Sequence, residues 1–180
     1  LINASERLLG SQGNTSHKVI ADHIRSSVFL ISDGVIPEKE GRGYVLRRIM
    51  RRGIRHGYKI GAKKPFMHLL VKDLIKLMNS AYPELKKKQK DIIELIKNEE
   101  IKFFETLETG IEILEETISN MKNKTLSGDV VFKLHDTYGF PFDLTADIAR
   151  EKQLDIDEER FNECMNQQKQ TSKASSSFVS

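Results

Sequence analysis

One segment, residues 83–121, constrains the fold of this chain more than any other feature. Apolar side chains recur along it in steps of three, four or seven: Ile92, Ile96, Phe103, Leu107, Ile111, Leu114, Ile118 and Met121. Because an α-helix has 3.6 residues per turn, this spacing places them on one side of a helix. The segment predicts a helix of roughly 38 residues, about 57 Å long at 1.5 Å per residue. Gly110 interrupts the pattern and marks a candidate bend.

Shorter apolar stripes predict further helices on either side. A helix that starts at Ser16 and is capped near Gly34 would bury one stripe, formed by Ile20, Ile24, Val28 and Ile31. Other predicted helices cover residues 44–56, 66–81, 129–138 and 142–152, and a last one starts at Asp155 or Asp157. Residues 1–13 are weakly patterned, so we expect a loop there, and only residues 130–132 suggest a strand.

These segments predict an all-α, multihelical fold with two helical subdomains joined by a long helix. We expect a basic helical subdomain at residues 1–82, the connecting helix at 83–125 and a second helical subdomain at 126–180. The second subdomain contains the turn His135–Pro141. No internal repeat is visible in the sequence.

Composition excludes several classes of protein. The single cysteine, Cys164, excludes a disulfide scaffold and a cysteine-rich zinc site, and it is typical of a reducing compartment. No run of about eighteen apolar residues is present, so we expect no membrane partner. No secretory signal opens the chain, and we expect a cytoplasmic location. Because the chain starts at Leu1 without a methionine, we expect it to be a piece of a longer protein.

The charge is divided unevenly between the two halves of the chain. Residues 1–90 carry 19 Lys and Arg against 7 Asp and Glu, a net charge of +12, whereas residues 91–180 carry 10 against 19, a net charge of −9. This asymmetry indicates that the first half meets a polyanion. The alternative is that the two halves neutralise each other across their interface.

The most informative stretch is Gly41–Pro65, which contains nine Lys and Arg and no Asp or Glu. On a helical wheel at about 100° per residue, apolar residues fill one half: Val45, Leu46, Ile49, Met50, Gly53 and Ile54. Arginines fill the other half: Arg47, Arg48, Arg51, Arg52 and Arg55. Like charges four residues apart destabilise a helix by about 0.2–0.5 kcal/mol per pair. We therefore expect a negative partner to cover this face.

Two kinds of partner fit the arginine face. A guanidinium is planar, bidentate and weakly hydrated, which suits phosphates and base edges and favours nucleic acid. The alternative is pairing with the acidic side chains of the long helix: Glu94, Glu99, Glu100, Glu105, Glu108, Glu112, Glu115 and Glu116.

A second candidate site is the turn His135–Pro141. Asp136 lies beside aromatic residues just before Gly139, where a carboxylate can accept a hydrogen bond from a base amino group. The alternative is that Asp136 or Thr137 satisfies backbone groups at a helix end while the aromatic side chains belong to the core.

Other kinds of site find no support in the sequence. The five histidines show no ligand spacing with cysteine or carboxylate, so no metal site is predicted. Cys164 has no histidine near it in the sequence and is interpreted as a structural or incidental thiol. Gly41-Arg42-Gly43 lacks the further glycine and lysine of a phosphate-binding loop. We predict no catalytic residues and no nucleotide site.

Four blocks of residues carry a resemblance to a known family. They are Val19–Arg25, Ser32–Val35, Gly41–Ile49 and Phe132–Pro141, the last followed by Asp143-Leu144-Thr145. These blocks resemble alanyl-tRNA synthetases, in the family's order and at its spacing, and the resemblance covers the chain from about residue 15 to its end. It implies a helical tRNA-recognition domain that lies between the class II aminoacylation domain and the editing domain of the same polypeptide.

The resemblance also implies a function for the parent enzyme. Members of this family activate alanine with ATP and transfer it to tRNA, and they read a G·U wobble pair in the acceptor stem of alanine tRNA. The implied segment contains neither the ATP-binding motifs nor the zinc-binding editing site. We therefore expect ATP and zinc in the parent enzyme outside this segment, no cofactor within it, and no catalysis by the segment alone.

Individual residues carry over to the family's motif. Asp136 matches the aspartate that contacts the wobble pair, and Lys39 stands where many members have an asparagine that contacts the same pair. A lysine can donate to guanine O6 or N7 but cannot accept from a base amino group. The resemblance implies that the tRNA backbone is held by Arg42, Arg47, Arg48, Arg51, Arg52 and Arg55. The rival hypothesis is a non-catalytic helical module whose basic half docks an acidic protein or its own acidic half.

Overall fold

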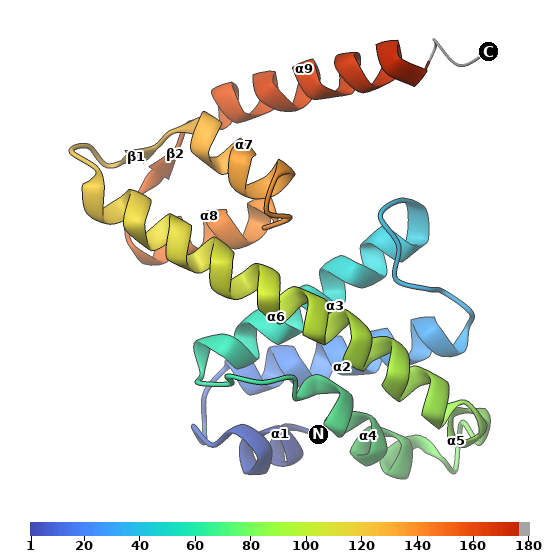
Figure 1. Cartoon of the computed structure of the whole chain (residues 1–180). Coiled ribbons are helices and arrows are strands. Elements are labelled where there is room, and N and C mark those ends of the chain that lie inside the picture. The colour runs from blue at the N-terminus through green and yellow to red at the C-terminus, as the bar shows by residue number, and fades with distance from the viewer. Residues whose placement is uncertain (177–180) are drawn as a thin grey trace. The chain divides into compact units, whose positions relative to one another are not determined.

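The computed structural model describes the backbone of residues 1–176 and the side chains of residues 1–170 (Figure 1). The prediction of an all-α fold is confirmed. The chain forms two compact units, Leu1–Glu105 and Thr106–Ser180, and the long helix α6 (Gln89–Asn120) contributes residues to both. The predicted division at residues 82 and 125 stays a prediction, and its last four residues lie outside the described part of the chain.

The first unit is built from helices. Its elements are α1 (Ile2–Leu9), α2 (Ser16–Ser32), α3 (Gly41–Lys59), the 3-10 helix η1 (Met67–Leu69), α4 (Leu70–Met78), α5 (Glu84–Lys87) and the first part of α6. Helices α2 and α3 lie side by side (Figure 1). The predicted α2 stripe is buried, as are Leu46, Met50 and Ile54 of α3. In α4, Leu70 and Leu74 are buried, but Leu77 is 60% exposed although its spacing predicts burial.

The prediction of a loop over residues 1–13 is wrong, because residues 2–9 form helix α1. Its buried face is made of small side chains, Ala4 and Ser5, so no stripe of large apolar residues marks this helix in the sequence. Ser5 Oγ is hydrogen-bonded to His17 Nδ1 at 2.8 Å, and both side chains are fully buried. This bond ties α1 to α2.

The prediction of one helix over residues 83–121 is wrong at its start. Helix α5 ends at Lys87, and α6 begins at Gln89, so α6 has 32 residues. The ammonium group of Lys88, between the two helices, donates to the backbone oxygen of Ser32 at 2.5 Å. Ser32 is the last residue of α2, where a backbone carbonyl has no hydrogen-bond donor within the helix. The Lys88 side chain supplies this missing donor.

The second unit contains the rest of α6, β1 (Thr125–Leu126), α7 (Gly128–Asp136), α8 (Phe142–Glu151), β2 (Asp155–Ile156) and α9 (Glu158–Ser176). The strands β1 and β2 pair in parallel. The strand suggested at residues 130–132 is wrong, since these residues lie in α7. Two-residue strands are too short to show an alternating pattern in the sequence.

Helix α6 continues through Gly110, where the sequence marks a candidate bend. A Cβ atom at position 110 would lie 2.1 Å from Cδ2 of Phe140, whose ring is fully buried. Phe140 is placed by a helix-terminating turn, in which its N–H donates to the oxygen of Leu134 at 2.8 Å and Gly139 has φ +64°. The glycine in α6 thus provides the space for this ring.

Candidate nucleic-acid interface

Two of the predicted arginines of α3 face helix α6. Arg47 Nε and Arg51 Nε both donate to Oε1 of Glu99, at 3.0 and 2.9 Å. The three side chains are 21%, 13% and 8% exposed, respectively. The Arg51 guanidinium also lies 4.7 Å from the centroid of the Phe103 ring. Pairing of the arginine face with the acidic long helix is therefore confirmed for these two residues.

Arg55 continues the same side of α3 one turn beyond Arg51, and it is only 5% exposed. Burial lowers the pKa of Arg51, while the nearby Glu99 carboxylate opposes this shift. An arginine remains charged under such conditions. Arg47, Arg51 and Arg55 thus place positive charge on the packed side of α3, and the Glu99 carboxylate offsets part of that charge.

The other arginines of α3 are exposed. Arg48, Arg52 and Lys59 follow one another in steps of four and seven residues, so they form one line along the helix, which we term the basic stripe. Arg42, in the first turn of α3, is exposed as well. The basic stripe is the part of the arginine face that a polyanion can reach.

Aromatic and apolar side chains border the basic stripe. Tyr44 is 43% exposed, and the Arg48 guanidinium lies 5.9 Å from the centroid of its ring. Val45 is 54% exposed, although the helical wheel places it on the apolar half. It sits at the edge of that half, about 20° from Arg52 on the wheel, which explains why it is not buried.

Two histidines lie close to the arginines of α3 and are not charged at neutral pH. Burial lowers the pKa of His56 to about 4, with the charges of Arg55 and Arg52 adding to the shift. Its Nδ1 is 3.1 Å from Ser16 Oγ. Burial is also the main cause of the lowered pKa of His23. The positive charge of α3 near neutral pH therefore comes from its arginines and lysine.

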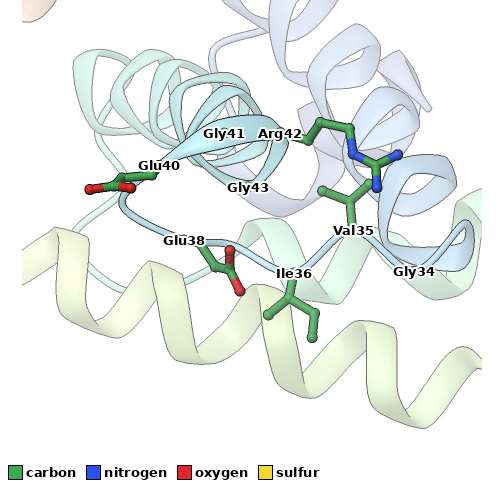
Figure 2. Close-up of a pocket in the computed structure, with 8 residues that line it drawn as sticks. All are labelled: Gly34, Val35, Ile36, Glu38, Glu40, Gly41, Arg42 and Gly43. Carbon is green, nitrogen blue, oxygen red and sulfur yellow. The ribbon is translucent and has the colours of Figure 1, made fainter.

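The loop that carries Lys39 packs against the start of α3. A Cβ atom at Gly43 would lie 2.3 Å from the backbone oxygen of Ile36 and 2.7 Å from Cβ of Glu38, so only glycine permits this approach. A cavity of about 450 Å³ lies beside the loop. Figure 2 shows the residues that line it: Gly34, Val35, Ile36, Glu38, Glu40, Gly41, Arg42 and Gly43. Lys39 is exposed on this loop.

The second predicted base-reading residue, Asp136, lies at the C-terminal end of α7 and is exposed. Gln168 Nε2, on α9, donates a hydrogen bond to Asp136 Oδ1. Within the described residues, the Asp136 carboxylate accepts no hydrogen bond from a backbone N–H. The neighbouring aromatic residues fit the structural interpretation, since Phe140 is buried and Phe142 stacks on Phe161 with the ring centroids 4.6 Å apart.

The predicted site residues are distributed over both units. Lys39 and the arginines belong to the first unit, whereas Asp136 belongs to the second. Three residues with contacts to this set were not singled out from the sequence: Glu99, Tyr44 and Gln168. Tyr44 could have been found on the wheel, where it falls beside the arginines. Glu99 is one of eight glutamates with similar sequence context, and Gln168 lies in a uniformly polar stretch.

Two further properties concern the described residues as a whole. No three His, Cys, Asp or Glu side chains among them lie close enough together to hold a metal ion. None of the described helices has both the length and the apolar character needed to cross a membrane.

Comparison with known proteins gives a consistent result. The family model for tRNA synthetases class II (A) matches residues 1–180. The alanine–tRNA ligase of Nitrosomonas europaea is 57% identical over 181 residues, which cover 99% of this chain and 21% of the relative. That of Neisseria meningitidis serogroup C is 58% identical over 168 residues, covering 93% of this chain and 19% of the relative. That of Burkholderia thailandensis is 53% identical over 183 residues, covering 99% of this chain and 21% of the relative.

The chain thus spans about a fifth of the length of these curated relatives. The resemblance carried by the motif blocks is confirmed. Because the family model covers the whole chain, the protein belongs to the class II (A) tRNA synthetase family, to which its alanine–tRNA ligase relatives point.

Proposed function

We propose that this chain is the part of an alanine–tRNA ligase that binds the acceptor stem of alanine tRNA and reads its G·U pair. The observation that carries the proposal is the separation of charges on α3. Arg47 and Arg51 are held by Glu99, whereas the basic stripe faces outward. A line of exposed cations without acidic neighbours on its own helix suits the phosphate backbone of RNA.

The first part of the proposed mechanism is positioning. Arg42, Arg48 and Arg52 contact phosphates of the stem and fix its register on the protein. Arg47, Arg51 and Arg55 contribute positive potential to the same backbone and hold α3 in place. Phosphate contacts of this kind carry no sequence information, so base reading needs other groups.

The second part is base reading. The carboxylate of Asp136 accepts a hydrogen bond from a base amino group of the G·U pair, because an ionised carboxylate is an acceptor only. Lys39 donates to guanine O6 or N7, or to an exposed base carbonyl. A wobble pair displaces these groups relative to a Watson–Crick pair, so the two contacts together distinguish the stems.

The remaining activity of the parent enzyme belongs to other parts of the polypeptide. We propose that the complete protein activates alanine with ATP in an aminoacylation domain, edits its product in a zinc-containing domain and acts in the cytoplasm. The described residues supply no cluster of metal ligands.

One observation favours the rival hypothesis of a helical interaction module. Glu99 accepts hydrogen bonds from two arginines within the first unit, as self-pairing predicts. The basic stripe is exposed nonetheless, and the acidic-protein alternative provides no reason to prefer one RNA base pair over another. Preference between base pairs therefore separates the two hypotheses, whereas salt dependence does not, since both are electrostatic.

Replacement of Arg48 or Arg52 by alanine is expected to weaken binding to all acceptor-stem hairpins alike. Each loss of a phosphate contact should lower the slope of log affinity against log salt by about one. Arg7→Ala is the matched control, because the Arg7 side chain on α1 is 73% exposed and its replacement removes the same charge. Fluorescence anisotropy titrations at several salt concentrations measure both quantities. Equal weakening by Arg7→Ala would contradict a specific role for the stripe.

Replacement of Asp136 by alanine is expected to abolish the preference for the G·U stem with little change in folding. The side chain is exposed, so its loss leaves the core intact, while a base contact contributes about 1–3 kcal/mol of discrimination. Affinities for two hairpins that differ only in G·U and G·C measure the preference, and the thermal midpoint measures folding. An unchanged preference in Asp136→Ala would contradict the assigned role.

A further inference from the structure

Gln168 contacts the carboxylate that we assign to base reading. It lies on α9, is half-buried, and donates its Nε2 to Oδ1 of the exposed Asp136. Within the described residues, Oδ2 of Asp136 accepts no hydrogen bond. One oxygen of the carboxylate is thus held by a side chain of the second unit, and the other has no hydrogen bond from the side chains of residues 1–170.

A second contact between the same two helices provides a comparison. Arg160 on α9 donates to Asp129 on α7 through Nη2 to Oδ1 at 2.8 Å and through Nε to Oδ2 at 3.1 Å. The thiol of Cys164 also donates to Oδ1, at 3.6 Å. These hydrogen bonds, first of all those from Arg160, lower the pKa of Asp129. Both of its oxygens and its charge are used inside the protein.

The two contacts lie on one line along the helices. From Asp129 to Asp136 is seven residues, and from Arg160 to Gln168 is eight, so both contacts recur after about two turns. The starts of α7 and α9 are also close, since a Cβ atom at Gly128 would lie 2.4 Å from the backbone nitrogen of Phe161. The arginine contact and this close approach fix α9 beside α7, which brings Gln168 to Asp136.

The chemical difference between the two contacts is the charge of the donor. A guanidinium can pair with both oxygens of a carboxylate and offsets its charge, and Arg160 is shared in this way between Asp129 and Glu163. A neutral amide donates to one oxygen and leaves the charge in place. It also removes rotational freedom from the carboxylate, so the second oxygen keeps a fixed direction. Such fixed geometry is what a group that binds a base edge requires.

We propose that Gln168 is a positioning residue for base reading, which orients the Asp136 carboxylate so that Oδ2 faces the base amino group. This inference rests on the proposed function of Asp136. Gln168 acts through Asp136 and does not itself contact the RNA. The alternative is a purely structural role in which Gln168 only attaches α9 to α7.

The experiment uses the 180-residue chain with Gln168→Ala, Asp136→Ala and the double variant. Gln170→Ala is the matched control, because Gln170 is an exposed glutamine on the same helix. The probes are two acceptor-stem hairpins of identical sequence except for G·U or G·C, and the readout is the ratio of their dissociation constants. Gln168→Ala should lower the preference for G·U by about threefold to tenfold, the usual effect of one hydrogen bond. Its affinity for the G·C hairpin should stay within about twofold of the unsubstituted chain.

The variants also distinguish the possible roles. In the Asp136→Ala background, Gln168→Ala should have no further effect on the preference, since its action requires the carboxylate. Gln168→Glu removes the donor and adds a like charge beside Asp136, so it should lower the preference at least as much as alanine. Gln170→Ala should leave the preference unchanged.

Two results would overturn the inference and are separable from failure of the proposed function. If Asp136→Ala loses the preference but Gln168→Ala retains it, the positioning role is wrong and the function of Asp136 stands. If Gln168→Ala weakens both hairpins equally and lowers the thermal midpoint, its role is structural. If Asp136→Ala itself retains the preference, the proposed function is wrong.

Discussion

Glu100→Ala is expected to lower the free energy of unfolding of the first unit by about 3–5 kcal/mol, the typical cost of removing one partner from a buried charged network. The Glu100 carboxylate is fully buried. Its Oε1 accepts from the backbone N–H groups of Phe66 at 2.9 Å and Met67 at 2.6 Å. Its Oε2 accepts from the backbone N–H of His68 at 2.9 Å and is 2.6 Å from His68 Nδ1.

The effect is large because the donors lie at the start of a helical segment. The N–H groups of Phe66, Met67 and His68 precede or begin η1, where a helix offers them no acceptor. Without the carboxylate they would be buried and unpaired, at about 1–3 kcal/mol for each group. Glu100 thus attaches the segment before α4 to helix α6.

Glu94→Ala is the control, since Glu94 is exposed on the same helix. It should change the free energy of unfolding by less than about 0.5 kcal/mol. Urea denaturation followed by circular dichroism measures all variants. Glu100→Gln, which keeps one acceptor oxygen, should fall between the unsubstituted chain and Glu100→Ala. A loss below about 1 kcal/mol for Glu100→Ala would show that the backbone donors find other partners.

Glu99→Gln is expected to act on stability and RNA binding in opposite directions. Glutamine keeps an acceptor oxygen but removes the negative charge that offsets the charges of Arg47 and Arg51, which both donate to Glu99, and Arg51 is mostly buried over Phe103. The free energy of unfolding should fall by about 3 kcal/mol. Binding to RNA hairpins at low salt should become tighter, because a negative charge disappears beside α3 and Arg47 is freed to turn toward the backbone.

The added affinity should not depend on the base pair. The affinity for both hairpins should rise equally, so the preference for G·U stays unchanged. The slope of log affinity against log salt should become steeper by about one, the effect of one further phosphate contact. Glu105→Gln changes the net charge by the same amount at an exposed position of α6 and is the matched control. Weaker RNA binding by a folded Glu99→Gln variant would mean that Glu99 orients Arg47 and Arg51 for contact with RNA.

The sequence predicts most of the helices because large apolar residues at helical spacing are what the core requires. Ile20, Ile24 and Val28 are fully buried in α2, as their spacing predicts. The sequence pattern does not predict helix α1, because its buried face consists of alanine and serine and not of large apolar residues. At the break between α5 and α6, Lys88 contacts Ser32, a residue 56 positions earlier, and no local pattern contains that contact.

The candidate site shows a similar limit. The composition of α3 identifies an arginine-rich face, but five arginines on one wheel do not show which of them meet another helix. That choice depends on Glu99 and on the side of α3 against which α6 packs. Tertiary placement therefore decides that Arg48 and Arg52 remain exposed. The motif around Asp136 is visible in the sequence, whereas its contact with Gln168 depends on how α9 packs beside α7.

The central claim is that these 180 residues read a base pair as well as the RNA backbone. The most direct test is binding of the unsubstituted chain to the hairpin of the alanine tRNA acceptor stem and to its G·C counterpart, at about 50 and 200 mM salt. The account predicts tighter binding to the G·U hairpin at both salt concentrations, by about tenfold, with both affinities falling as salt rises. Equal binding to the two hairpins at both concentrations would contradict it.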